Sequence, residues 1–198
     1  MGKIFCVMGK SGCGKDTIFK ELINDNNLNL KPIILYTTRP KRQGEINGVE
    51  YFFIDEKQLE ELRSQGKIIE LRSYNTVHGV WYYSTIDDGQ INLSYNYLLI
   101  CTLEAYNNIK NYFGENFVVP IYINVEDGSR LKRALSREMA QNTPQYEEMC
   151  RRFLADCTDF SKLKLSEANI IKYYDNENLT DCIAEICKLI TNQINKDV

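Results

Sequence analysis

The chain has 198 residues, enough to bury one sizeable hydrophobic core but few for two independent domains. Hydrophobic residues make up 43% and charged residues 26% of it, the proportions of an ordinary soluble globular protein. The formal net charge of −3 argues against broad binding to nucleic acid, and no stretch has the length of a membrane span. Residues 1–8 are too short for a signal sequence. We therefore expect a cytoplasmic protein with no nucleic-acid or membrane partner.

The cysteines give no sign of a metal centre or a disulfide framework. There are seven, with no C-x-x-C pair and no metal-like spacing relative to the single histidine, His78. Several occupy apolar positions of strand-like or helical runs. We expect them to act as small apolar residues in a reducing compartment.

A glycine-rich segment near the N-terminus stands between a short apolar run, residues 3–8, and a helical pattern, residues 17–23. Its residues are Gly9, Lys10, Ser11, Gly12, Cys13, Gly14, Lys15, Asp16 and Thr17. Glycines between a strand and a helix let successive backbone N–H groups point into one concavity at the helix N-terminus, which attracts phosphate. Lys15 is placed to reach the outer phosphates of a nucleoside triphosphate. The whole segment is therefore predicted to bind a nucleoside triphosphate.

The residue after Lys15 departs from the usual pattern of this loop. That place normally holds Ser or Thr, whose hydroxyl binds Mg²⁺, whereas here it holds Asp16, with Thr17 next. A carboxylate is a good oxygen ligand for Mg²⁺, directly or through water. We therefore expect Mg²⁺ to accompany ATP, with Asp16 as its candidate ligand.

A second concentration of functional residues follows a short strand predicted at residues 33–36. Arg39 and Arg42 flank a proline and form a rigid basic loop suited to a phosphate, because guanidinium groups match phosphate oxygens in pairs. A strand at 51–54, a helix at 56–65 and an antiparallel hairpin of 68–74 with 79–85 are predicted next. Residues 37 to about 90 thus form a small mixed α/β insertion on a larger parallel sheet.

The rest of the chain repeats strand and helix. Strands are predicted at 97–103, 117–125 and 169–174, and an amphipathic closing helix at 179–194. From residue 127 the pattern is helical and basic, and a polar stretch with a proline at 139–144 marks a hinged tip between two helices. Arg130 and Lys132 are expected on the solvated face. The prediction is one α/β domain with two appended mobile parts.

The chain resembles the guanylate kinase family over nearly its whole length. The specific feature is Thr-Thr-Arg-x-x-Arg-x-Gly-Glu-x-x-Gly-x-x-Tyr-x-Phe at residues 37–53, at the expected distance behind the glycine loop. The resemblance implies a P-loop NTPase three-layer core with a parallel β-sheet, a small mixed α/β NMP-binding insertion and a helical lid. Within a single domain of residues 1–198, it assigns 1–36, 91–136 and 153–198 to the core, 37–90 to the NMP-binding part and 137–152 to the lid.

The resemblance also implies roles for individual residues. Those that grip the phosphate of the acceptor nucleotide, GMP, are Arg39, Arg42 and Tyr51. Glu70 accepts hydrogen bonds from guanine N1 and N2, and Glu104 stands near the place of a second acidic base reader, although it is equally suited to cap the following helix. The family's tyrosine after the hairpin falls on Tyr82 or His78, with Tyr82 preferred.

The positive charge for the transferring phosphoryl group is implied to come from Lys15, Arg39 and three lid arginines. The lid arginines are Arg133, Arg137 and either Arg151 or Arg152, and we adopt Arg152 in the predicted catalytic set.

Two departures from the family pattern bear on the activity. Leu35 stands where the family has a base-contacting serine, and Asp16 replaces the loop hydroxyl. The predicted activity is transfer of the γ-phosphoryl group of ATP to GMP. Two alternatives are a ribose 1,5-bisphosphate phosphokinase, a relative whose loop also tends to read Gly-Lys-Asp, and a non-catalytic guanylate-kinase-like binding module. The intact motif at 37–53 opposes the first, and the presence of Lys15 opposes the second.

Overall fold

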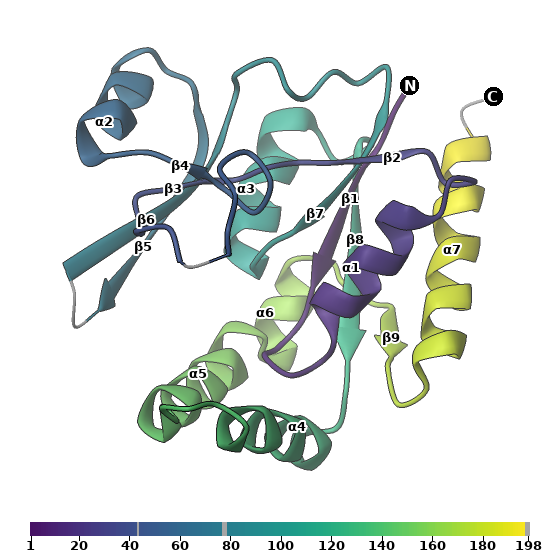
Figure 1. Ribbon diagram of the computed structural model, residues 1–198. Coiled ribbons are helices and arrows are strands. Elements are labelled where there is room, and N and C mark those ends of the chain that lie inside the picture. The colour runs from purple at the N-terminus through teal and green to yellow at the C-terminus, as the bar shows by residue number, and fades with distance from the viewer. Residues whose placement is uncertain (43, 77–78, 197–198) are drawn as a thin grey trace.

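A parallel sheet of five strands, in the order β2-β7-β1-β8-β9, forms the centre of the computed structural model, which describes residues 1–42, 44–76 and 79–196 (Figure 1). Its strands are β1 (Ile4–Met8), β2 (Leu30–Pro32), β7 (Asn96–Ile100), β8 (Val118–Asn124) and β9 (Tyr173–Asp175). The glycine loop follows β1, the middle strand. It therefore lies at the carboxyl edge of the sheet, where ligands of open parallel sheets bind.

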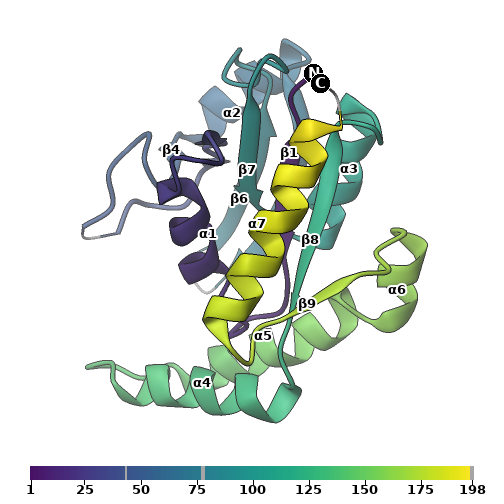
Figure 2. The same cartoon turned by 90° about the vertical axis from the view of Figure 1, so that its right-hand side faces the viewer.

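Helices cover both faces of this sheet, because alternate residues of β1 point to opposite sides. Phe5 and Val7 pack with α1 (Lys15–Asn24) and α7 (Leu179–Asn195). Ile4 and Cys6 pack with α3 (Leu103–Phe113) and α6 (Lys162–Glu167). Figure 2 shows α1 and α7 on one side of the sheet and α3 on the other. The predicted three-layer α/β core is confirmed.

A second sheet of four strands, in the order β4-β3-β6-β5, extends from one side of the first (Figure 1). Its strands are β3 (Tyr36–Thr37), β4 (Phe52–Phe53), β5 (Ile68–Thr76) and β6 (Gly79–Ile86). β3 pairs with β4 in parallel, whereas β5 and β6 form the expected antiparallel hairpin. α2 (Glu56–Ser64) begins with a capping box between Asp55 and Gln58.

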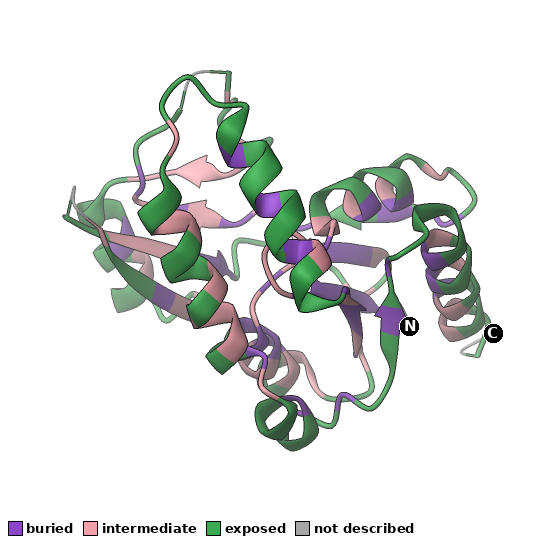
Figure 3. Cartoon of the chain, turned by 90° about the horizontal axis from the view of Figure 1, so that it is seen from below, coloured by how far each residue is buried: buried purple, intermediate pink, exposed green. Residues whose placement is uncertain are grey.

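Two helices, α4 (Asp127–Met139) and α5 (Tyr146–Asp159), cross below the carboxyl ends of the strands (Figure 1). α4 buries Arg130, Ala134 and Glu138, which lie four residues apart on one face, whereas α5 has no buried residue (Figure 3). No helix among the described residues is both long and apolar enough to cross a membrane.

Three element predictions are corrected by the structure. The run predicted as one strand at 33–36 links the two sheets instead, since β2 ends at Pro32 and β3 begins at Tyr36. The last strand starts only at Tyr173, because Asn169 adopts a positive φ of 60° and Ile171 is 89% exposed. α6 was not expected from the sequence.

The closing helix generates a stability prediction. Ile186 of α7 is fully buried, so Ile186→Ala removes packed atoms and leaves a cavity. We expect the free energy of unfolding to fall by about 3 kcal/mol, measured by urea denaturation. The control Ile171→Ala, at an exposed position, is expected to change it by less than about 0.5 kcal/mol. Equal effects of the two substitutions would contradict the assigned core.

Candidate functional site

The glycine loop is shaped by close contacts with distant segments. Gly12 and Gly14 have φ angles of 81° and 91°, which favour glycine over any residue with a side chain. A Cβ atom on Gly12 would lie 3.0 Å from the carbonyl oxygen of Arg130 in α4. A Cβ atom on Gly14 would lie 2.4 Å from the amide nitrogen of Asn176, which follows β9. The sequence requirement for glycine here thus comes from both backbone conformation and packing.

The side chain of Lys15 lies against the loop. Its Nζ donates hydrogen bonds to the carbonyl oxygens of Gly9, at 2.7 Å, and Lys10, at 3.1 Å. Its neighbour Cys13 is fully buried, and this burial raises the pKa of the thiol. The loop therefore holds the Lys15 ammonium against its own backbone, with a buried thiol close by.

Both backbone groups of Ser11 are bonded to the helices below the sheet. Nη1 of Arg130 donates to the Ser11 carbonyl oxygen at 2.8 Å, and the Ser11 N–H donates to Oδ2 of Asp156 at 2.6 Å. Asp156 belongs to α5, and its carboxylate also lies 3.9 Å from the Arg130 guanidinium. We call this set of bonds between Arg130, Asp156 and Ser11 the loop clamp.

Arg130 is fully buried, which overturns its expected place on the solvated face of α4. Its Nη2 pairs with Oδ1 of Asp127 at 2.7 Å, and its guanidinium lies 4.5 Å from the ring centroid of Phe153. Hydrogen bonds from Arg130, and then from Lys10, lower the pKa of Asp127 against the opposing effect of desolvation. The buried positive charge of Arg130 is tolerated because the Asp127 carboxylate and the Ser11 carbonyl oxygen compensate for its loss of water.

Asn176 ties the loop to a predicted lid arginine. Its side-chain amide donates to the carbonyl oxygen of Cys13 at 2.8 Å, and its own carbonyl oxygen accepts from Nη2 of Arg133 at 3.1 Å. Arg133 and Arg137 are both exposed on α4. The structure therefore brings Arg133 to the edge of the loop.

Arg151 and Arg152 of α5 share one carboxylate. Each donates from Nε to an oxygen of Glu148 at 2.6 Å, and each side chain is more than half exposed. These bonds, that of Arg151 above all, lower the pKa of Glu148 to about 2. The same hydrogen bond to Glu148 raises the pKa of Arg151, against the lowering effect of burial.

Arg39, from the second sheet, is buried with its guanidinium already paired. Nη2 and Nη1 donate to the two oxygens of Glu45 at 2.7 and 3.0 Å, and the group lies 5.5 Å from the ring centroids of both Tyr51 and Phe53. The backbone N–H of Arg42 donates to the same carboxylate at 2.7 Å, and the Arg42 residue is exposed. The three predicted phosphate-gripping residues are thus adjacent.

Tyr83, rather than Tyr82, joins this group. The Tyr83 ring packs at 5.7 Å from that of Tyr51, and its hydroxyl contributes with Glu45 to a raised pKa of Arg39, against the lowering effect of burial. Because side chains alternate along a strand, Tyr82 points to the opposite face of β6. Tyr83 is therefore the tyrosine of this pair that packs beside Tyr51, and the role expected of Tyr82 stays a prediction. The other alternative, His78, lies outside the described residues.

Glu70, the expected base reader, is buried and bonded to Arg72 of the same strand. Nε and Nη2 of Arg72 donate to Oε2 and Oε1 of Glu70 at 2.9 and 3.3 Å, and Oγ1 of Thr85 donates to Oε1 at 2.9 Å. Nη1 of Arg72 reaches Oγ1 of Thr102 at 3.3 Å. Arg72 was missed in the sequence. Its position two residues from Glu70, hence on the same strand face, was the available signal.

Glu104 is exposed on the first turn of α3, and it does not cap this helix. The cap is Thr102, whose Oγ1 accepts from the backbone N–H of Ala105. Glu104 instead lines a cavity of about 650 Å³ with Thr102, Lys164 and Asp159.

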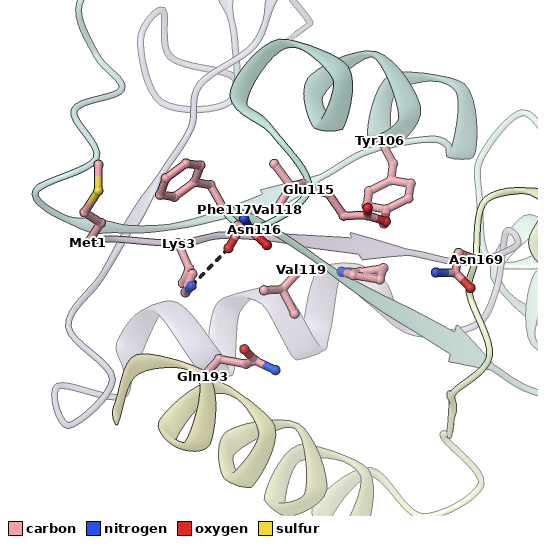
Figure 4. A pocket seen from close by; sticks show the side chains of 11 residues that line it. Met1, Lys3, Tyr106, Glu115, Asn116, Phe117, Val118, Val119, Asn169 and Gln193 are labelled. Atoms are coloured by element: carbon pink, nitrogen blue, oxygen red, sulfur yellow. Dashed lines mark hydrogen bonds between the residues drawn. The ribbon is translucent and has the colours of Figure 1, made fainter. Parts of the chain in front are cut away.

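Another cavity, of about 710 Å³, lies away from these residues (Figure 4). It adjoins Lys3 and Val118, at the amino ends of β1 and β8, whereas the glycine loop is at the carboxyl end of β1. Nζ of Lys3 is bonded there to the carbonyl oxygen of Asn116 at 3.0 Å. This cavity is therefore not a candidate for the nucleotide site.

The oxygen ligands near the loop fit Mg²⁺. No group of three or more His, Cys, Asp or Glu residues is gathered in the part of the chain that the structure describes, so a metal held by protein alone is not indicated there. Asp16 is exposed in the first turn of α1, and Thr17, the next residue, is exposed as well. One or two such oxygens suffice for Mg²⁺ that is bound chiefly by phosphates and water.

Comparison with known proteins agrees with this geometry. Residues 1–163 match the family model described as guanylate kinase. The chain is 31% identical to a guanylate kinase of Mesomycoplasma hyopneumoniae, over 99% of this chain and 98% of the relative. It is 30% identical to one of Clostridioides difficile, over 98% and 90%. A crystal structure of guanylate kinase from Anaplasma phagocytophilum shares the fold, with a TM-score of 0.63 and 22% identity over 97% of this chain and 86% of that one.

The loop clamp generates a prediction about nucleotide binding. Arg130→Met removes a charged hydrogen bond to Ser11, worth about 1.5 kcal/mol, and the dissociation constant for ATP is expected to rise about tenfold in calorimetric titration. The control Lys132→Met, at an exposed position of the same helix, is expected to bind ATP as the unchanged protein does. Unaltered binding by Arg130→Met would show that the clamp does not shape the loop.

Proposed function

The chain belongs to the guanylate kinase family, and we propose that it transfers the γ-phosphoryl group of ATP to GMP, giving ADP and GDP. The observation that carries this proposal is the presence of two basic elements in one chain. The glycine loop with Lys15 follows β1 at the carboxyl edge of the parallel sheet, and the second sheet holds a buried Arg39 that is paired with Glu45 and flanked by Tyr51. Transfer between two nucleotides requires one phosphate-binding element for each of them.

The loop is proposed to bind the donor, ATP, through residues 9–17. Its backbone N–H groups and the N-terminus of α1 attract the phosphates, and Lys15 reaches the outer ones. In the structure, the Lys15 ammonium is held by two carbonyl oxygens of the loop, at 2.7 and 3.1 Å. Negatively charged phosphate oxygens are stronger acceptors than carbonyls, so ATP is expected to draw this ammonium outward.

The acceptor phosphate is proposed to bind at Arg39, Arg42 and Tyr51, with Tyr83 beside them. The guanidinium of Arg39 is oriented by Glu45 and by the flanking rings, so little side-chain entropy is lost when the phosphate arrives. Glu70 and Glu104 are proposed to contact the base.

The transferring phosphoryl group needs positive charge and alignment rather than a general base, because the acceptor phosphate is already anionic. We propose that Lys15, Arg39, Arg133, Arg137 and Arg152 supply this charge. Arg133 already stands at the loop through Asn176. Closure of the tip between α4 and α5 would exclude water, which otherwise competes as acceptor.

Mg²⁺ is the proposed metal, and Asp16 is the residue proposed to hold it. When bound with ATP it neutralises charge on the phosphates. We also propose the functional division into core (1–36, 91–136 and 153–198), NMP-binding part (37–90) and lid (137–152). The lid limits fall inside α4 and α5, so the lid comprises the facing ends of these two helices and their connection.

The test of the proposed function is the substitution Lys15→Ala. Removal of the loop ammonium is expected to lower kcat for GDP formation by a factor of about 10³ or more, because one preorganised charge on the phosphates is lost. The unfolding transition is expected to be unchanged. Lys20→Ala, at an exposed position of α1, serves as the control and is expected to keep full activity. Turnover retained by Lys15→Ala would refute the donor site.

The role of Asp16 is tested by a titration of Mg²⁺. Asp16→Ala removes the candidate ligand, and the Mg²⁺ concentration for half-maximal activity is expected to rise about tenfold, the effect of losing one metal contact. Glu21→Ala, also exposed on α1, is expected to leave the titration unchanged. An unaltered Mg²⁺ requirement in Asp16→Ala would place the metal on other oxygens.

A further inference from the structure

The carboxylate of Asp156 connects α5 to the glycine loop, which comes down to this helix after β1 (Figure 1). Its Oδ2 accepts the backbone N–H of Ser11 at 2.6 Å, a short distance that is typical of a charged acceptor. Phe153, one turn earlier on α5, lies against the guanidinium of Arg130. Two residues on one face of α5 thus fix this helix to the loop clamp.

The N–H of Ser11 and the C=O of Lys10 form one peptide group, and this group is held at both ends. It is planar and trans, so its C=O and its N–H point in opposite directions. The Lys10 carbonyl oxygen accepts from Nζ of Lys15 at 3.1 Å and from the backbone N–H of Cys13 at 3.3 Å. Asp156 and the Lys15 ammonium are therefore bonded to opposite ends of the same peptide group.

The two ends of this peptide group influence one another by polarisation. A carboxylate on the N–H makes the carbonyl oxygen more negative, and hydrogen bonds linked in this way strengthen one another. The Lys10 oxygen is therefore a better acceptor for Lys15 while Asp156 is charged. The side chain of Asp156 is 18% exposed, so water screens this effect only in part. The other partner of the ammonium, the Gly9 carbonyl oxygen at 2.7 Å, does not depend on Asp156.

The next peptide group is held in the opposite sense. The carbonyl oxygen of Ser11 accepts from Nη1 of Arg130 at 2.8 Å. A carboxylate thus binds the N–H of Ser11 while a guanidinium binds its C=O, and neither peptide group can rotate without losing a bond to a charged side chain. The Lys10 carbonyl is therefore kept directed at the Lys15 ammonium for as long as Asp156 is in place.

We propose that Asp156 is a positioning residue for Lys15, and that it keeps the ammonium in its resting place on the loop until ATP arrives. This inference rests on the proposed function, in which the phosphates of ATP draw Lys15 outward. The bonds that hold the ammonium on the loop carbonyls oppose this movement. Asp156 strengthens one of them through the peptide group, so it lowers the affinity for ATP without contacting the nucleotide.

Asp156→Asn is the variant that separates the charge of this side chain from its shape. An asparagine keeps an oxygen that can accept from the Ser11 N–H, but it has no charge to polarise the peptide group. Asp159→Asn makes the same chemical change three residues later on α5, where the side chain is 62% exposed and paired with Lys164, and it is the matched control. Both variants are expected to keep the thermal unfolding transition of the unchanged protein.

The first measurement follows the Lys15 ammonium by NMR of isotope-labelled lysine in the protein without nucleotide. The signal is assigned by its absence from Lys15→Ala. Hydrogen bonds slow the exchange of ammonium hydrogens with water, so the exchange rate is expected to rise at least about twofold in Asp156→Asn and to stay unchanged in Asp159→Asn. An unchanged rate in Asp156→Asn would overturn the inference, even if that variant bound ATP more tightly, because its charge would then act on ATP through space.

The second measurement is the dissociation constant for ATP in the presence of Mg²⁺, by calorimetric titration. We expect it to fall about threefold in Asp156→Asn, because the resting place of Lys15 becomes less stable, and to stay unchanged in Asp159→Asn. A purely structural role of Asp156 would raise the constant, as expected for Arg130→Met. A raised or unchanged constant in Asp156→Asn would therefore overturn the inference. Failure of the unchanged protein to form GDP would instead contradict the proposed function, and the ammonium measurement would still test the hold of Asp156 on Lys15.

Discussion

The shape of the phosphate loop depends on close packing by two segments that lie far away in the sequence. The backbone of Arg130 presses against Gly12, the amide of Asn176 presses against Gly14, and each side chain bonds to a loop carbonyl oxygen. The loop therefore keeps this form only if α4 and the segment after β9 are in place. Because Asp156 of α5 contacts both Arg130 and Ser11, α4 and α5 are joined physically to the glycine loop.

Arginine side chains that are paired with carboxylates explain how a chain with a net charge of −3 can bind two polyanionic nucleotides. Arg39 is matched by Glu45, Arg72 by Glu70, and Arg130 by Asp127. Each buried arginine is oriented and partly neutralised before any ligand binds, which offsets its desolvation. The positive potential is thus confined to the region of these arginines, and it does not require a basic protein surface overall.

Much of this could be predicted from the sequence, because the signals are local. The loop at 9–17, the motif at 37–53 and the hairpin are each contained in a short segment, and each was found. Arg130 was misplaced because its partners, Ser11 and Asp156, are far along the chain. Tyr83 was not considered beside Tyr82 and His78, because strand register decides which tyrosine packs against Tyr51, and spacing alone does not give the register. Arg72 was not singled out from the sequence, and only the structure shows its hydrogen bonds to Glu70 and Thr102.

The most direct test of the central claim, a donor loop beside a base-reading acceptor site, is product analysis after incubation with ATP and Mg²⁺. The acceptors are GMP, AMP, UMP, CMP and ribose 1,5-bisphosphate, supplied separately, and the nucleotides are separated by chromatography. The account predicts ADP and GDP in equal amounts with GMP, and little product with AMP, UMP, CMP or the sugar bisphosphate. The account would be contradicted if ribose 1,5-bisphosphate were the only acceptor phosphorylated. It would also be contradicted if none of the acceptors were phosphorylated.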